Sequence, residues 1–209
     1  EVEKLIGPDI LLWSASFFIK DPGSKSFVSW HQDSTYWGLK PLEIVTAWLA
    51  FTPSKTSNGC MQVIPGSHLR GQSAHKDTFS EDNLLSRGQE IDVDIHDEKV
   101  VDLILEPGEI SLHHVRIFHG SNSNVSNSVR IGFAMRYIPA HTIQEGGRTF
   151  AELVRGEDSY SNFDTPRPPA IEMGEEEWAV QQESLKRLNG ILLDSASQQI
   201  KVIGHRTYP

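Results

Sequence analysis

A histidine and an aspartate lie two positions apart in the aromatic stretch WHQDSTYWG, which begins at residue 30. If this stretch is a strand, His31 and Asp33 project from the same face and can converge on one metal ion. A surface histidine beside an aspartate in a turn explains so short a pattern better when the pattern is taken alone. A third ligand elsewhere in the chain decides between these two interpretations.

The stretch SLHHVRIFHGS at 111–121 offers three further imidazoles, those of His113, His114 and His119. Two histidines and one carboxylate form the facial triad of non-heme Fe(II) oxygenases, which leaves coordination positions open on one side of the metal. Spacing alone does not choose among the three, because His113 and His119 would share a face of an unbroken strand and His114 would not.

Arg130 is the fourth candidate, and it follows the last of these histidines across a polar loop. If strands 115–119 and 129–138 pair as a hairpin, Arg130 lies beside His119. A guanidinium in that place binds a carboxylate through two parallel hydrogen bonds. Arg136 alternates onto the same face, and we expect it to be a surface arginine or part of a structural ion pair.

The elements that must position these residues are predicted to be strands for the first two thirds of the chain. Apolar or alternating runs, several of them ended by Pro-Gly pairs, predict strands at 10–20, 43–51, 60–64, 100–105, 109–114 and 129–139. Many short strands at such spacing favour an all-β sandwich or barrel.

Two segments differ from this pattern. Residues 66–90 are polar and glycine-rich, and a connection of that length is often a lid or a binding loop. After a proline-rich connector at 162–170, residues 176–193 place leucines at helical spacing and predict a C-terminal helix. We expect residues 34–42, residues 66–90 and the tail to build the substrate pocket.

Composition excludes several classes of protein. The chain has 209 residues, one cysteine (Cys60) and a net charge of −9. One cysteine excludes an internal disulfide framework, and the acidic balance argues against nucleic-acid or anionic-membrane partners. No apolar run reaches the ~20 residues that span a bilayer. We therefore expect a cytoplasmic protein that acts on a small molecule, with an oligomeric state that the sequence does not show.

Four blocks of the chain together resemble the phytanoyl-CoA dioxygenase family of Fe(II)/2-oxoglutarate-dependent oxygenases. They are WHQDSTYWGL, TAWLAFTPSKTSNGCMQVIPGSH, PGEISLHHVRIFHGSNSN and VRIGFAMRYIP. The resemblance implies a double-stranded β-helix, the jelly-roll barrel of the cupin superfamily, with flanking helices. We expect residues 1–209 to form one oxygenase domain, with the barrel at about 10–140 and a C-terminal extension at 141–209.

The resemblance also assigns roles to residues. It implies that His31, Asp33 and His119 bind iron and that Arg130 anchors 2-oxoglutarate. Ser121 matches a hydroxyl that often helps to hold the same carboxylate. Trp48 matches a tryptophan near the cosubstrate pocket, although packing in the core explains it equally well.

Other matched positions carry less information. His114 matches a family histidine expected near the pocket, and Ser14 and Lys20 match positions at the pocket edge. His75, in the long polar segment, is expected to face solvent rather than substrate.

The activity implied by the resemblance is hydroxylation of an unactivated C–H bond, with release of succinate and CO2 from 2-oxoglutarate and O2. Related halogenases replace the carboxylate ligand by a small residue, so the presence of Asp33 indicates a hydroxylase rather than a halogenase. Two alternatives stay open. One is a cupin-type lyase, isomerase or hydrolase that uses another metal without 2-oxoglutarate, and the other is a non-catalytic barrel that binds a small molecule.

Overall fold

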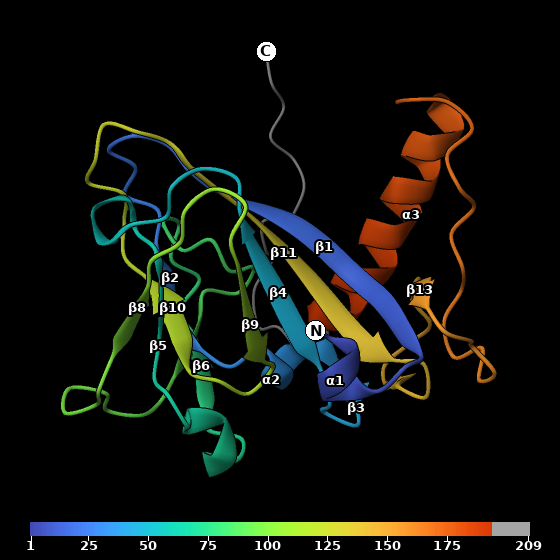
Figure 1. The fold of residues 1–209 in the computed structure, drawn as a ribbon, viewed down its shortest axis with the longest axis horizontal. Coiled ribbons are helices and arrows are strands. Elements are labelled where there is room, and N and C mark those ends of the chain that lie inside the picture. Colours follow the sequence, from blue (N-terminus) through green and yellow to red (C-terminus); the bar gives the residue numbers. More distant parts are fainter. Residues whose placement is uncertain (194–209) are drawn as a thin grey trace.

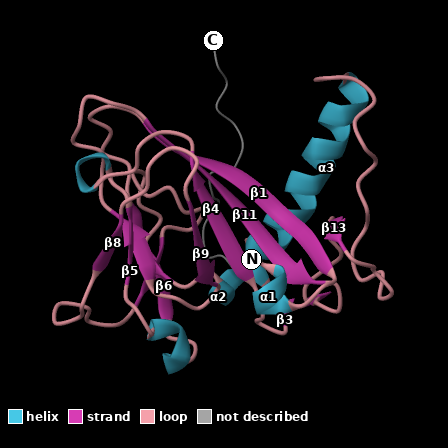
Figure 2. Cartoon of the chain, in the orientation of Figure 1, coloured by secondary structure: helices cyan, strands magenta, loops and turns pink. Residues whose placement is uncertain are grey.

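The computed structural model describes residues 1–193, and its strands form two antiparallel sheets that enclose a central cavity. In Figure 1 the smaller sheet lies on the left and the larger one crosses the centre, and Figure 2 shows how few helices accompany them. The predicted all-β jelly-roll core with flanking helices is confirmed. The predicted domain boundary at 209 lies outside the described residues.

The larger sheet has the order β13-β1-β11-β4-β9. Its strands are β13 (Glu152–Arg155), β1 (Ile10–Lys20), β11 (Arg130–Pro139), β4 (Val45–Ala50) and β9 (Ile110–His114). Register pairs along β1 and β11 run from Ile10 opposite Pro139 to Lys20 opposite Arg130. These two strands are therefore paired from end to end.

The smaller sheet has the order β2-β10-β5-β8. Its strands are β2 (Val28–His31), β10 (His119–Ser121), β5 (Met61–Val63) and β8 (Val101–Leu103). Two short pairs accompany the sheets, β3 (Leu39–Lys40) with β12 (Ile143–Gln144), and β6 (His75–Asp77) with β7 (Gln89–Ile91). The helices are α1 (Glu3–Ile6), α2 (Ser34–Trp37), η1 (Thr56–Asn58), η2 (Ser67–Arg70) and α3 (Glu175–Leu192).

One predicted strand pairing is wrong. Strands β10 and β11 do not form a hairpin, because β10 belongs to the smaller sheet and β11 to the larger one. The intervening polar loop crosses the barrel, and the buried side chain of Asn124 holds it by donating to the carbonyl oxygens of Lys20 and Ser128. His119 and Arg130 therefore approach the cavity from different sheets.

Alternation along β11 decides what faces the cavity. Arg130 and Ala134 are 2% exposed, and both line the cavity. On the opposite face, Phe133 packs against Phe17 of β1, with ring centroids 4.6 Å apart. This is the period of two expected for a strand, and it confirms the faces predicted from the sequence.

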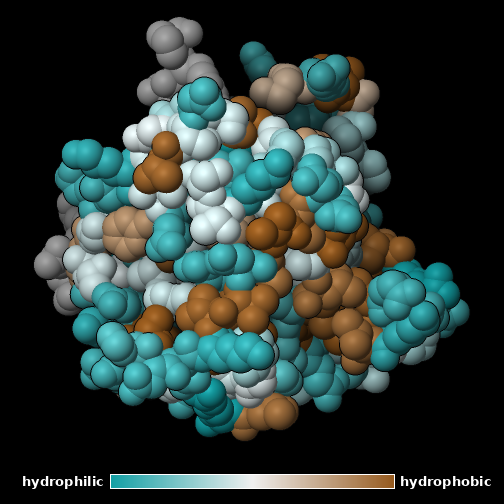
Figure 3. Space-filling model, turned by 60° about the vertical axis from the view of Figure 1, so that its left-hand side comes forward, coloured by the Kyte–Doolittle hydropathy of each residue, from teal (hydrophilic) through white to brown (hydrophobic). Residues whose placement is uncertain are grey.

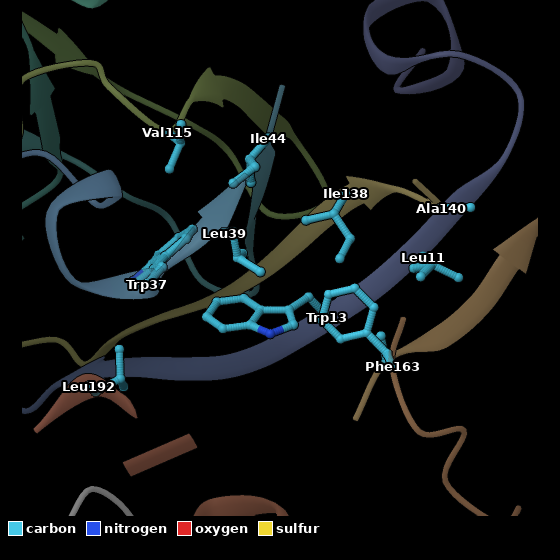
Figure 4. Packing of buried hydrophobic residues seen from close by; sticks show 11 residues of the cluster. Leu11, Trp13, Trp37, Leu39, Ile44, Val115, Ile138, Ala140, Phe163 and Leu192 are labelled. Atoms are coloured by element: carbon cyan, nitrogen blue, oxygen red, sulfur yellow. The ribbon is translucent and has the colours of Figure 1, made fainter. Parts of the chain in front are cut away.

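One end of the barrel is closed by a cluster of buried apolar side chains (Figure 4). The indole rings of Trp13 in β1 and Trp37 in α2 lie 5.2 Å apart at its centre. Leu192, near the end of α3, belongs to the same cluster. The predicted C-terminal helix is thus confirmed, and apolar packing attaches it to the barrel.

The long polar segment 66–90 is held in place by short elements. It contains η2, β6 and the start of β7. The guanidinium of Arg87 donates to Asp77 Oδ2 from Nε at 2.8 Å, lies over the Tyr36 ring, and contacts the carbonyl oxygen of Leu192 at 3.4 Å. One buried arginine therefore joins this segment to α2 and α3.

The surface mixes polar and apolar side chains, with apolar groups gathered toward the middle and right of the face in Figure 3. No helix in residues 1–193 is both long enough and apolar enough to cross a membrane.

Candidate metal and carboxylate site

His31 and Asp33 reach the cavity by a route that the sequence did not indicate. His31 is the last residue of β2, whereas Asp33 has helical dihedral angles and precedes α2, so the prediction of one continuous strand is wrong. Between them, the buried side chain of Gln32 donates to the carbonyl oxygens of Gly71 and Arg116. This anchored bend turns both flanking side chains toward the cavity.

His119 completes the group from the neighbouring strand. It opens β10 and pairs in register with His31. Nε2 of His31 lies 3.3 Å from Asp33 Oδ1, and Nε2 of His119 lies 3.9 Å from Asp33 Oδ2. One ligand atom from each of the three residues lies within 4.8 Å of the others. The structure therefore brings together the three predicted ligands.

The hydrogen bonds of the two imidazoles fit a metal site. Nδ1 of His31 lies 2.9 Å from the Ser29 carbonyl oxygen, and Nδ1 of His119 lies 3.0 Å from that of Ile117. A carbonyl oxygen accepts only, so Nδ1 carries the proton and Nε2 presents a lone pair. Two Nε2 lone pairs and a carboxylate then converge without a donor between them, which is the arrangement that a bound cation stabilises.

The pKa shifts agree with this protonation state. Burial lowers the pKa of His119 to about 3, with the charge of His31 acting in the same direction. Burial alone would raise the pKa of the Asp33 carboxyl, but His119, His31 and, to a smaller extent, the charge of Arg136 bring it below its ordinary value. Neutral imidazoles and an ionised carboxylate are the forms that bind metal at neutral pH.

A second group of polar side chains lies where the end of β1 meets the start of β11. Arg130 is 2% exposed, and Lys20 stands opposite it in register on β1 with no exposure. Lys20 Nζ donates to Ser121 Oγ at 2.7 Å and also contacts the carbonyl oxygen of Asn122. Of these two side chains Arg130 lines the cavity and Lys20 does not, and we call the pair the cationic end.

The cationic end lacks an anion among the described residues. Neither side chain forms an ion pair there, and Arg130 Nε has no hydrogen-bond partner. Burial and the neighbouring Arg130 lower the pKa of Lys20 to about 7, and burial lowers the pKa of Arg130 to about 10. Buried cations are costly unless paired, so this end fits a carboxylate supplied by a ligand.

Trp48 serves both the core and this site. Its ring lies so close to Gly132 that a Cβ at that glycine would be 1.8 Å from it. The guanidinium carbon of Arg130 lies 5.3 Å from the Trp48 ring centroid. The glycine therefore provides the space in which the indole contacts the arginine.

The cavity between the two sheets has a volume of about 280 Å³ and contains all six predicted site residues. Its walls also include side chains from the three segments expected to build the pocket, namely Trp37, Leu84, Leu85, Ser86, Gln89, Leu185, Leu188 and Leu192. The binding role expected for these segments is consistent with this lining.

Other expectations need correction. Arg136 lines the cavity and forms no ion pair among the described residues, so its predicted surface or ion-pair role is wrong. The sequence contained a signal for this position, because Arg136 alternates onto the same strand face as Arg130. His114 is not among the lining residues and lies beside His68, whereas the neighbouring His113 lines the cavity. His75 is half-buried and does not line the cavity, and its Nε2 accepts a hydrogen bond from the Gln32 backbone.

Comparison with known proteins identifies the family. Residues 2–132 match the model of the phytanoyl-CoA dioxygenase (PhyH) family. The chain belongs to this family. It is 31% identical over 133 residues to phytanoyl-CoA dioxygenase domain-containing protein 1 of Danio rerio, which covers 61% of this chain and 44% of that protein. The chain thus spans less than half the length of the curated PhyH relatives it matches.

Solved structures show the same fold. The apo form of ThoJ, a non-heme monooxygenase, superposes with a TM-score of 0.80 and 33% identity, covering 92% of this chain and 70% of that one. CytC3 with Fe(II) and alpha-ketoglutarate has a TM-score of 0.58 and 26% identity, covering 80% and 65%. The PhyH family depends on Fe(II) and 2-oxoglutarate, and the donor sets found here suit both.

Proposed function

We propose that this PhyH-family chain is an Fe(II)/2-oxoglutarate-dependent dioxygenase that hydroxylates a C–H bond of a small organic substrate. In this proposal His31, Asp33 and His119 hold the iron. The observation that carries it is the convergence of three acceptor atoms, within 4.8 Å of one another, in the same cavity as the buried guanidinium of Arg130, which forms no ion pair among the described residues.

The cationic end would hold the far carboxylate of 2-oxoglutarate. Arg130 supplies the charge and the paired donors. The ammonium of Lys20 donates to Ser121 Oγ, so the Ser121 hydroxyl proton is left free to point at the ligand. Trp48 forms the adjacent wall and fixes the position of the guanidinium.

The iron, once bound with 2-oxoglutarate, would supply activation of O2 with release of succinate and CO2. The protein's own contribution is orientation of the bound molecules and exclusion of water. Trp37 and the leucines of α3 provide apolar walls on the side of the cavity away from Arg130. The carboxylate of Asp33 takes a coordination position that a halide would otherwise need, which favours hydroxylation.

The rival functions fit less well. A lyase or hydrolase that works without 2-oxoglutarate gives no reason for a buried guanidinium in the cavity wall with a second buried cation opposite it. A barrel that only binds its ligand gives no reason for the Nδ1 hydrogen bonds that aim both Nε2 lone pairs at the carboxylate.

The proposal is tested by screening a metabolite library for succinate release with Fe(II), 2-oxoglutarate and ¹⁸O₂. We expect release to depend on all three reagents, and the product of the responding substrate to gain one ¹⁸O atom. Asp33→Ala and Arg130→Leu should each lower turnover at least about 100-fold. Turnover without 2-oxoglutarate, or unchanged turnover in Asp33→Ala, would contradict the proposal.

A further inference from the structure

Four polar side chains form a row across the larger sheet at one level of the barrel. Register pairs join Ser14 to Arg136, Arg136 to Thr46, and Thr46 to His113. Side chains at register-paired positions on neighbouring strands stand side by side on the same face. All four line the cavity. We call Ser14, Arg136, Thr46 and His113 the polar row.

Most hydrogen-bonding capacity in the polar row is unused. Thr46 is 2% exposed and His113 is 8% exposed, yet Thr46 Oγ1 and His113 Nδ1 have no partner among the described residues. Unpaired buried polar atoms are costly in a protein interior. A ligand that supplies the missing partners would remove that cost.

Arg136 is the charged member of the row. It donates to Ser16 Oγ at 2.7 Å and makes a longer contact with the carbonyl oxygen of Ala134 at 3.4 Å. Its guanidinium carbon lies 5.6 Å from the Trp37 ring centroid and 5.8 Å from that of Phe18. A guanidinium has five N–H donors, so most of them face the cavity between two aromatic walls without an acceptor.

Arg136 lies on the other side of the metal site from Arg130. The two arginines are six positions apart on one strand, or about 20 Å along its backbone. Two contacts show on which side of the metal site each arginine lies. Ser121, two residues after His119, accepts a hydrogen bond from Lys20 beside Arg130. Trp37, in the helix that follows Asp33, lies against Arg136. A 2-oxoglutarate molecule that joins the metal to Arg130 would therefore leave Arg136 free for a second ligand.

We propose that the primary substrate is an organic acid whose carboxylate pairs with Arg136 in the polar row. This inference rests on the proposed function, because it assigns Arg130 to the cosubstrate. The carboxylate accepts two parallel bonds from the guanidinium, and the Thr46 hydroxyl donates a third. The carbon skeleton then extends between the metal site and the leucines at 84, 85, 185 and 188.

The pairing determines specificity. A neutral amide of the same shape leaves the guanidinium without its anion in an aromatic pocket. A site built for a polar group rejects the analogue that lacks this group far more strongly than an apolar pocket rejects a size change. Acids should therefore bind in strong preference to their amides.

The test loads the full chain with Zn(II), as an inert substitute for iron, and with saturating 2-oxoglutarate, so that the Arg130 end is occupied. A library of organic carboxylates and their matched primary amides is screened by ligand-observed NMR, and calorimetry gives the Kd of each hit. We expect acids to bind at least tenfold more tightly than their amides. Arg136→Leu should weaken the acids at least tenfold and change the Kd of 2-oxoglutarate less than twofold.

Two further variants serve as controls. Arg136→Lys keeps the charge and should retain part of the acid affinity if Arg136→Leu fails to fold. Arg155→Leu makes the same change at an exposed arginine and should leave the Kd values of the acids and of 2-oxoglutarate unchanged.

Several results would overturn the inference. The inference fails if acid and amide bind with equal affinity, if no acid binds, or if acid binding survives Arg136→Leu. It also fails if Arg136→Leu loses metal or 2-oxoglutarate binding, because Arg136 would then be a positioning residue for Asp33. Failure of 2-oxoglutarate to bind the Zn(II)-loaded wild type would instead overturn the proposed function, and this inference with it.

Discussion

Each of the two imidazoles in the candidate triad is oriented by the carbonyl oxygen two residues before it, that of Ser29 for His31 and that of Ile117 for His119. The strand backbone itself therefore selects the Nδ1–H tautomer, without a carboxylate acting as orienting partner. Residue types and spacing made His31 and Asp33 candidates, and the family resemblance chose His119 among three histidines. The sequence could not predict that backbone oxygens would fix their protonation, because that depends on the side-chain rotamers.

Lys20 makes the stability of the empty protein depend on pH. Its pKa is lowered to about 7 in the folded chain, first by burial and then by Arg130, against an ordinary value of 10.5. Between these values the unfolded chain binds more protons, so the free energy of unfolding rises with pH. Below pH 7 Lys20 is protonated in both the folded and the unfolded chain, and the folded state then bears the full free-energy cost of burying the charged ammonium.

The measurement is urea unfolding of the ligand-free protein from pH 6 to 9. From pH 7 upward, the wild type should gain up to about 1.4 kcal/mol per pH unit relative to Lys20→Met. The variant isolates this group from others that titrate in the same range. Parallel pH profiles for the two proteins would show that Lys20 does not titrate there.

The short elements around the cavity depend on a few buried contacts between segments far apart in the sequence. Arg87 joins β6, α2 and the end of α3 through Asp77, Tyr36 and Leu192. These contacts hold residues 84–86 where they line the cavity.

Replacement of Arg87 by methionine should therefore loosen the cavity wall. Removal of one partner from the pair with Asp77, in which both side chains are largely buried, should lower the unfolding free energy by about 3 kcal/mol. Hydrogen exchange should accelerate at 78–88 and at the end of α3. The matched change Arg155→Met, in an exposed pair with Glu3, should cost about 1 kcal/mol or less. Equal effects of the two changes would contradict this function of Arg87.

The prediction of elements succeeded where local pattern decides structure. The strands at 10–20 and 129–139 and the helix at 176–193 were found from periodicity, because one face of each is apolar over many residues. The bend between His31 and Asp33 was missed, since the buried bonds of Gln32 to Gly71 and Arg116 make it and both partners are distant in the chain. The false hairpin has the same cause: the jelly-roll path carries β10 and β11 to different sheets.

For the whole molecule, one cavity is lined by Arg130, the candidate triad and the polar row. Both sheets contribute to it, and α3 closes part of one side. This packing of α3 supports our proposal that residues 1–209 act as a single oxygenase domain. The sequence predicted the first two parts through family motifs, whereas the polar row depends on register across four strands.

The most direct test of the central claim is calorimetric titration of 2-oxoglutarate into the Fe(II)-loaded chain without oxygen. We expect one 2-oxoglutarate to bind per chain in the wild type and no binding to the metal-free protein. Asp33→Ala should abolish metal-dependent binding, and Arg130→Leu should raise the Kd about 100-fold or more. Affinity that is unchanged by loss of the metal or by Arg130→Leu would contradict the account.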